Sequence, residues 1–349
     1  MNVSKQESSE QPLLAWTLGD VAGIGPELVV KAWPDPEVHS LCRPIVIGSV
    51  EILRRVAEEL GSSVRIEPIT ADDIPGLEFT PNVIPCFDPT GIPVGHLTMG
   101  QVHADAGQAA HDYLIAGIDL AVAGTVDGIV TLPLHKEGLH AAGLPYPGHT
   151  EILAERTGSR EYGMMLYRRG LGVLHVTLHM SIRKALDAIT TPAIEEKIAL
   201  IDKMMRQLAV PHPRLAVAAL NPHASDGGLF GNEEESIVLP AVLRAKEKGF
   251  DVVGPIPADT LFVRASKGEF DGVVALYHDQ GHIALKLLGW REAVNITVGL
   301  PIIRTSVAHG TAYDIVGQGK ADPTSLLEAL RVASLLCRSR RKLRNGEVL

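Results

Sequence analysis

Three histidines follow three apolar runs of the sequence, each shortly after the run ends. His179 comes after "GVLHV", His223 after "LAVAAL" and His278 after "GVVAL". Neutral imidazoles suit a divalent transition metal, and three protein ligands leave positions open for a substrate. The pattern therefore predicts a catalytic metal site. Histidine ligation favours zinc, cobalt or nickel, while an oxygen-rich substrate also allows magnesium or manganese.

A single histidine at the end of a strand is more often a structural residue whose hydrogen bonds are met by its neighbours. Further histidines compete for the role of ligand, namely His149, His175, His282 and His309. Spacing alone leaves metal binding and a structural role open.

Several polar and charged residues occur within mostly apolar segments of the chain. Lys286 and Arg304 fall on or near predicted strands, as does Asn295, and a cation on a mostly apolar segment needs a partner. A phosphate or carboxylate ligand would supply one, and so would a buried Asp or Glu. In "PGHTE", Thr150 is a plausible helix N-cap, but capping does not explain His149 beside it.

Glycine-rich loops offer sites for an anion. "GDVAGIGPE" places Pro26 where a helix would begin, and exposed amides at such a helix end can hold an anion. The alternative is a tight turn. The segment is not G-x-G-x-x-G, so the fingerprint of a Rossmann dinucleotide site is absent from it. "NPHASDGGLFGNEE" could likewise approach a ligand closely or merely shape a loop.

The segment "HGTAYDIVGQGKADPTSLLEAL" reads as a long loop that enters a helix. Asp314 could accept a hydrogen bond from a ribose hydroxyl, and His309 could stack on an adenine or bond to it. The alternative is a glycine-shaped connection in which Asp314 is a turn residue.

Short apolar runs that alternate with helical patterns must position these residues. This alternation predicts an α/β architecture with a largely parallel or mixed sheet, in which ligands bind beyond the carboxyl ends of strands. The predicted strands are 13–17, 44–48, 128–132, 172–176, 215–220, 272–276 and 294–299. The predicted helices are 106–123, 193–208, 233–248 and 324–337.

Composition limits the classes of function. The chain has 349 residues, enough for about two domains, and a net charge of −9 argues against nucleic acid or an anionic membrane as partner. Cys42, Cys86 and Cys337 are far apart, which favours a reducing compartment. The first twelve residues have no apolar core of a signal peptide, and no apolar run is long enough to span a membrane. A cytoplasmic protein is expected.

The motifs together resemble the 4-hydroxythreonine-4-phosphate dehydrogenase family of pyridoxine (vitamin B6) biosynthesis, over about residues 14–330. The resemblance rests on "TLGDVAGIGPE", "KEGLHAAG", "GHTEILAERTG", "LNPHASDGG", "GPIPADTLF", "YHDQG" and "VNITVGLPIIRTSVAHGTA". The last block also resembles the adenosine-binding loop of isopropylmalate and isocitrate dehydrogenases. That wider group binds NAD or NADP without a Rossmann fold.

The resemblance implies a two-domain, isocitrate/isopropylmalate dehydrogenase-like α/β fold. Domain 1 would comprise residues 13–135 and 300–349 with the nucleotide-binding loop. Domain 2 would comprise 136–299 with the metal ligands and the interface of a homodimer with a shared active site. The site would lie in the cleft between the two domains.

The resemblance also implies roles for residues at matching positions. Asp259 and Asp279 would lie near the metal as acid/base or ligand-orienting groups, with Gly281 letting the chain turn close to the ligand. The remaining assignments are metal ligands His179, His223 and His278; substrate contacts His149, Thr150, Lys286, Asn295 and Arg304, with Lys286 also catalytic; and cofactor contacts His309, Gly310, Thr311 and Asp314.

The implied reaction is NAD(P)- and divalent-metal-dependent oxidative decarboxylation on CH–OH. The first expected substrate is 4-(phosphooxy)-L-threonine, with 3-amino-2-oxopropyl phosphate and CO2 as products. The alternative is D-threonate or D-erythronate 4-phosphate from acid-sugar catabolism. More distant alternatives are terephthalate dihydrodiol dehydrogenase and a metal-dependent lyase or hydrolase without nicotinamide. A non-catalytic phosphate-binding protein is a third class, which the three intact histidines disfavour.

Several positions depart from the vitamin B6 enzymes. His282 replaces an apolar residue, Ala308 an aspartate and Val21 a proline, and "LHVTLHMS" around His179 is closer to the acid-sugar and dihydrodiol branches. The departures bear on the substrate more than on the reaction. Retention of "GHTE", Lys286 and Arg304 favours a phosphorylated substrate over an aromatic dihydrodiol.

Overall fold

The computed structural model describes residues 11–346, which form two compact units. Unit 1 comprises residues 11–159 and 300–338, and unit 2 comprises 160–299 and 339–346. Residues 136–159, which sequence analysis assigned to the second domain, cluster with unit 1. The first ten residues, in which a signal segment was sought, lie outside the described part. Within 11–346 no helix is both long and apolar enough to cross a bilayer.

Unit 1 is built on parallel strands in the order β3-β4-β2-β1-β5-β12. The strands are β1 (Leu13–Thr17), β2 (Arg43–Ile47), β3 (Arg65–Ile69), β4 (Val83–Phe87), β5 (Gly128–Thr131) and β12 (Arg304–Val307). The helices are α2 (Gly25–Ala32), α3 (Pro36–Leu41), α4 (Val50–Glu59), η1 (Ala71–Gly76), α5 (Ala104–Val122), α6 (Lys136–Ala141), α7 (His149–Thr157), η4 (Tyr313–Ile315) and α13 (Thr324–Arg344), which continues beyond residue 338.

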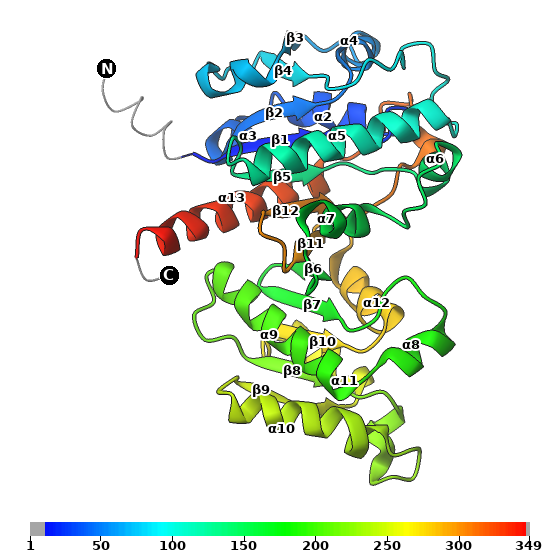
Figure 1. Ribbon diagram of the computed structural model, residues 1–349, viewed down its shortest axis with the longest axis vertical. Coiled ribbons are helices and arrows are strands. Elements are labelled where there is room, and N and C mark those ends of the chain that lie inside the picture. The colour runs from blue at the N-terminus through cyan, green and yellow to red at the C-terminus, as the bar shows by residue number, and fades with distance from the viewer. Residues whose placement is uncertain (1–10, 347–349) are drawn as a thin grey trace. The chain divides into compact units, whose positions relative to one another are not determined.

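The centre of this sheet is fully buried. Every residue of β1 and β5 is buried, as expected for parallel strands that helices cover. Helix α5 packs on β1, β2 and β5 (Figure 1). A Cβ on Gly117 of this helix would meet the Thr17 side chain at 2.9 Å, so glycine allows the close approach. The rigid sheet holds the loops at its carboxyl edge.

Unit 2 has a mixed sheet in the order β11-β6-β7-β10-β8-β9. The β11-β6-β7 pairs are antiparallel and the others parallel. The strands are β6 (Gly163–Arg168), β7 (Leu171–His175), β8 (Leu215–Ala218), β9 (Val252–Ile256), β10 (Gly272–Ala275) and β11 (Val294–Val298). The helices are α8 (Ile182–Ala188), α9 (Thr191–Gln207), η2 (Pro222–Asp226), the π-helix η3 (Glu234–Val238), α10 (Leu239–Glu247), α11 (Ala258–Ser266) and α12 (His278–Gly289).

Alternate residues of β7 face different helices. A Cβ on Gly172 would meet Met205 of α9 at 2.9 Å. On the other face, Val173 and His175 approach Gly281 of α12. Side chains alternate across a strand, so α9 and α12 cover opposite faces of this sheet. Because helices cover both faces of this sheet, a ligand can reach it at the carboxyl ends of its parallel strands.

The expected α/β class is confirmed, with one sheet parallel and the other mixed. The seven predicted strands all form, and the four predicted helices form at nearly the predicted positions. Two local expectations differ. The polar, glycine-containing segment "HDQGH" after the strand 272–276 indicates a loop, but it opens helix α12. The helix expected at 233–248 begins with a π-helical turn.

Candidate functional site

The predicted site residues of unit 2 follow neighbouring parallel strands. His179 comes after β7, His278 after β10, His223 after β8 and Asp259 after β9, and these strands lie in the order β7-β10-β8-β9. Carboxyl ends of parallel strands meet at one edge of a sheet, the usual place for a ligand site in α/β proteins.

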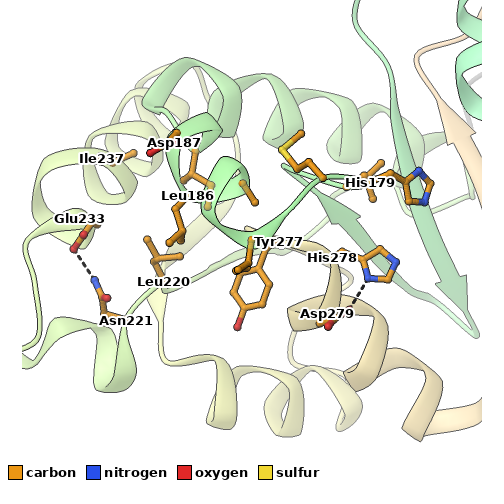
Figure 2. Close-up of a pocket in the computed structure, with 15 residues that line it drawn as sticks. His179, Leu186, Asp187, Leu220, Asn221, Glu233, Ile237, Tyr277, His278 and Asp279 are labelled. Carbon is orange, nitrogen blue, oxygen red and sulfur yellow. Dashed lines mark hydrogen bonds and ion pairs between the residues drawn. The ribbon is translucent and has the colours of Figure 1, made fainter. Parts of the chain in front are cut away.

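A pocket of about 1040 Å³ opens at this edge, and His179 and His278 line it together (Figure 2). Their ring centroids are 6.1 Å apart. Asn221 and Glu233 line the same pocket, joined by a hydrogen bond of 2.7 Å from Asn221 Nδ2 to Glu233 Oε2. Two of the predicted ligands therefore share one cavity.

His278 is oriented by its neighbour in sequence. Its Nδ1 lies 2.7 Å from Asp279 Oδ1. A carboxylate only accepts hydrogen bonds, so Nδ1 carries the proton and Nε2 of a neutral ring keeps its lone pair. This is how carboxylates commonly hold metal-binding histidines.

His223 lies on an exposed turn with unusual backbone geometry. The φ angles of His223, Ala224, Ser225 and Asp226 are 54°, 54°, 66° and 46°, all in the left-handed region. For a residue other than glycine, each such angle costs about 1–2 kcal/mol. Glu234, on the π-helix, accepts hydrogen bonds from Ser225 of this turn and from Leu220 and Asn221 just before it.

The three predicted ligands match a metal in donor type and in strand position. Among residues 11–346, however, no group of three His, Cys, Asp or Glu side chains is close enough to hold an ion. His223 is not among the residues that line the pocket of His179 and His278. The structure thus brings two of the three together.

Behind His278 lies a buried histidine pair that sequence analysis did not assign to the site. His282 stacks on His278, with centroids 3.8 Å apart and planes 13° from parallel. His282 Nδ1 lies 3.1 Å from His175 Nε2, and His175 Nδ1 lies 3.2 Å from Met164 O. The carbonyl only accepts, so His175 donates from Nδ1 and a neutral His175 accepts from His282.

Burial keeps both of these histidines neutral. It lowers the pKa of His175 to about 4 and that of His282 to about 2, with a smaller contribution from the neighbouring histidines. Gly281 makes room for the pair, because a Cβ there would lie 2.5 Å from His175 Nε2. The glycine therefore serves helix packing, which corrects the expectation that it turns the chain towards a ligand. A histidine inside the apolar run "GVLHV" was the available signal, since a buried polar group needs a partner.

In unit 1, the helix that begins with "HTE" meets the first residue of β12. Arg304 is 2% exposed, and its Nε and Nη2 donate to Thr131 Oγ1 at 3.2 and 2.7 Å. Burial lowers its pKa to about 9, opposed by the charge of Glu151. Burial, and next the charge of Arg304, hold the pKa of His149 well below its usual value. Thr150 beside it is buried.

The two glycine-rich loops of unit 1 contact each other. Ile24 N donates to Thr311 O at 3.0 Å, and Tyr313 Oη donates to Asp20 Oδ2 at 2.6 Å. Asp20 is fully buried, and burial raises its pKa. This joins "GDVAGIGPE" to the predicted cofactor loop, a contact that sequence analysis did not foresee.

The other predicted cofactor and site residues are more open. His309 is half-buried, with Nδ1 3.0 Å from Gly310 O, and burial lowers its pKa. Asp314 and Lys286 are exposed, and Asn295 is half-buried. Asp259 is exposed, and its Oδ1 accepts from Thr260 N at 2.9 Å. Asp259 does not line the pocket of His179 and His278.

Both units carry polar loops at the carboxyl ends of parallel strands, an arrangement typical of α/β proteins that bind small polar ligands. The chain belongs to the family described as pyridoxal phosphate biosynthetic protein PdxA, which matches residues 40–333. The resemblance seen in the sequence is thereby confirmed, and the protein is a member of a dehydrogenase family.

Its relatives carry two names. A D-threonate 4-phosphate dehydrogenase of Cupriavidus necator is 46% identical over 94% of this chain and 98% of its own. A 4-hydroxythreonine-4-phosphate dehydrogenase of Beijerinckia indica is 44% identical over 93% of this chain and 94% of its own. A crystal structure named 4-hydroxythreonine-4-phosphate dehydrogenase, from Klebsiella pneumoniae, is 43% identical with a TM-score of 0.83, covering 94% of this chain and all of that one.

Proposed function

We propose that this protein is an NAD(P)-dependent, decarboxylating dehydrogenase of a four-carbon, 4-phosphorylated hydroxy acid. The single observation that supports it most is the buried, charged Arg304 beside His149 and Thr150 in a chain of the PdxA family. A guanidinium in that position is suited to a phosphate or carboxylate.

The residues of the chain have separate parts in the proposed reaction. Arg304, with Lys286 and Asn295, would bind the charged ends of the substrate. His149 is neutral because of its burial and could accept or donate one hydrogen bond there. Asp279 orients His278 and, with Asp259, is a candidate to receive the hydroxyl proton as hydride leaves the carbinol carbon.

The loop that contains His309, Gly310, Thr311 and Asp314 would bind the adenosine of the nicotinamide cofactor. Its attachment to "GDVAGIGPE" through Thr311 and Tyr313 would fix it to the sheet edge. We further propose that unit 1 binds the nucleotide and unit 2 binds the metal, as expected for an isocitrate/isopropylmalate dehydrogenase-like fold.

A divalent ion would be held by His179, His223 and His278. For all three to bind one ion, His223 must move closer to the other two. When bound, the ion would favour the substrate alkoxide and stabilise the enolate left after carbon dioxide departs. A homodimer that works in the cytoplasm is part of the proposal. The three buried, free cysteines suit such a compartment.

D-Threonate 4-phosphate becomes the first candidate substrate, ahead of the 4-(phosphooxy)-L-threonine that the sequence led us to expect. Relatives with the threonate name are 42–46% identical to this chain, and those with the hydroxythreonine name 40–45%. The margin is small, so the second substrate stays a candidate.

The two candidates separate in one absorbance assay. Each is offered with NAD and with NADP, and reduced cofactor is followed over time. The proposal predicts a higher kcat/KM for D-threonate 4-phosphate. Preference for the amino substrate would place the protein in pyridoxine synthesis instead, and turnover of neither would contradict the proposed reaction.

A further inference from the structure

The turn that carries His223 cannot be held by its own backbone preference. Four successive residues other than glycine, His223 to Asp226, have left-handed φ angles, a conformation that L-residues adopt rarely and usually singly. Strain of this kind persists where the surroundings over-determine it. The question is which contact does so.

A single buried carboxylate accepts hydrogen bonds from residues on both sides of His223. Glu234 Oε1 accepts from the backbone amides of Leu220 at 2.8 Å and of Asn221 at 2.7 Å. Its Oε2 accepts from Asn221 Nδ2 at 3.0 Å and from Ser225 Oγ. The bonds therefore begin before His223 and end after it, and Glu234 is only 4% exposed.

The negative charge of Glu234 strengthens the hydrogen bonds that it accepts from these four donor groups. Burial opposes ionisation, but the hydrogen bonds from Asn221 and Ser225 together outweigh it and lower the pKa of Glu234. Hydrogen bonds to an ionised acceptor are the strong ones. Glu234 also opens a π-helical turn, a rare element that often occurs at functional sites.

The same network reaches the pocket of His179 and His278. Asn221, which donates to Glu234, also donates to Glu233 Oε2 at 2.7 Å, and Asn221 and Glu233 line that pocket (Figure 2). Gly231 has a φ of 124°, and a Cβ there would lie 2.4 Å from Glu233 Oε2. The contacts of this loop are therefore organised around the two carboxylates.

We propose that Glu234 is a positioning residue, which fastens the left-handed turn and so presents His223 for metal binding. It acts through Asn221 and Ser225 and does not touch the substrate. The inference rests on the proposed function insofar as His223 is taken to be a ligand. The fastening of the turn itself does not depend on that function.

The test compares Glu234→Gln with Glu235→Gln, a neighbouring exposed carboxylate, in the full-length protein. Glutamine keeps the shape but turns an NH2 group towards the donor Asn221 Nδ2. We expect faster amide hydrogen exchange across residues 220–228 of the metal-free E234Q protein. Zinc binding, measured by calorimetric titration, should weaken about 10–100-fold. Both readouts should be unchanged in E235Q.

A double variant separates positioning from general destabilisation. If Glu234 acts through His223, adding E234Q to His223→Ala should cause no further loss of zinc affinity. Should E234Q fail to fold, Ser225→Ala removes one donor to the same carboxylate. Ser225→Ala should weaken zinc binding roughly threefold, as the loss of one hydrogen bond implies.

Two results would overturn the inference. One is unchanged exchange at 220–228 in E234Q or, if that variant does not fold, in Ser225→Ala. The other is a lower melting temperature with full zinc affinity, which would make Glu234 merely structural. If the wild-type protein bound no zinc, the metal part of the proposed function would fail, and the exchange data would still decide whether Glu234 fastens the turn.

Discussion

Arg304 shows how a single residue can be expected from sequence while its setting cannot. A cation on an apolar segment needs a partner, and the sequence left a buried acid and a ligand anion equally open. The structure gives it Thr131 as a hydrogen-bond acceptor and Glu151 as a nearby charge. Thr131 and Glu151 lie 173 and 153 positions away in the chain, a pairing that no local pattern reveals.

Arg304→Lys tests the part of this residue in substrate binding. Lysine keeps the charge but loses the planar fork that binds a phosphate or carboxylate in two places. We expect KM for the phosphorylated substrate to rise about tenfold with kcat nearly unchanged, the pattern of lost uniform binding. Arg65→Lys, at an exposed position on the edge strand β3, is the control for a general effect of the substitution. Unchanged KM in Arg304→Lys would remove Arg304 from the substrate site.

Asp279→Asn tests the orientation of His278. The exposed carboxylate accepts from His278 Nδ1, and an amide would hold the ring less firmly and allow the other tautomer. Steady-state kinetics should show a fall in kcat/KM of about 10–100-fold. The free energy of unfolding should change by about 0.5 kcal/mol or less, since the side chain is 71% exposed. Wild-type kinetics in this variant would mean that Asp279 does not orient a functional ring.

The strands that could be predicted from the sequence are mainly those made of a continuous apolar run. The buried strands β1, β5, β8 and β10 stand out because both faces are covered. Five strands were not predicted. Strands β3, β4 and β9 have a proline in their interior, β12 reads "RTSV", and β6 ends in the polar pair "YR". Their pairing comes from neighbours in the sheet, which a local pattern does not contain.

Helix α12 was missed for a different reason. Two histidines, an aspartate and a glycine in its first turn read as a loop, yet the glycine is what lets the helix lie against β7. The histidine pair and the fastening of His223 depend on contacts between distant segments, so the sequence could name His179, His223 and His278 without showing how they are held.

Gly281→Ala tests the packing of α12 on β7. The new Cβ would lie 2.5 Å from His175 Nε2 and 2.7 Å from Val173 Cγ1, too close for either to stay in place. Overpacking should lower the free energy of unfolding by about 1–3 kcal/mol, even though alanine favours a helix. Urea unfolding would measure it against Gly91→Ala, where a Cβ meets nothing within 4 Å. A stabilised Gly281→Ala protein would contradict this account of the helix.

At the scale of the whole molecule, buried neutral histidines tie stability to pH. The folded pKa of His175 is about 4, while an unfolded histidine titrates near 6.5. Between these values the unfolded chain binds a proton that the folded protein does not, so stability falls as the pH is lowered through this window. The loss from one such group is on the order of 3 kcal/mol.

His175→Leu should make this decline shallower between pH 6.5 and pH 4, although it lowers stability at neutral pH by leaving His282 without its partner. Unfolding in urea at several pH values would show the slope. His212→Gln, at an exposed position, should leave the slope unchanged. Parallel pH profiles for the wild type and His175→Leu would contradict the burial of a neutral His175.

The central claim concerns the reaction, and its most direct test is the stoichiometry of products. Purified protein would be given D-threonate 4-phosphate, NAD or NADP and a divalent metal, and reduced cofactor and carbon dioxide would be measured together. The account predicts one carbon dioxide for each reduced cofactor, with both abolished by a chelator and restored by metal. Carbon dioxide without reduced cofactor would indicate a lyase, and neither product from this substrate or from 4-(phosphooxy)-L-threonine would contradict the proposed function.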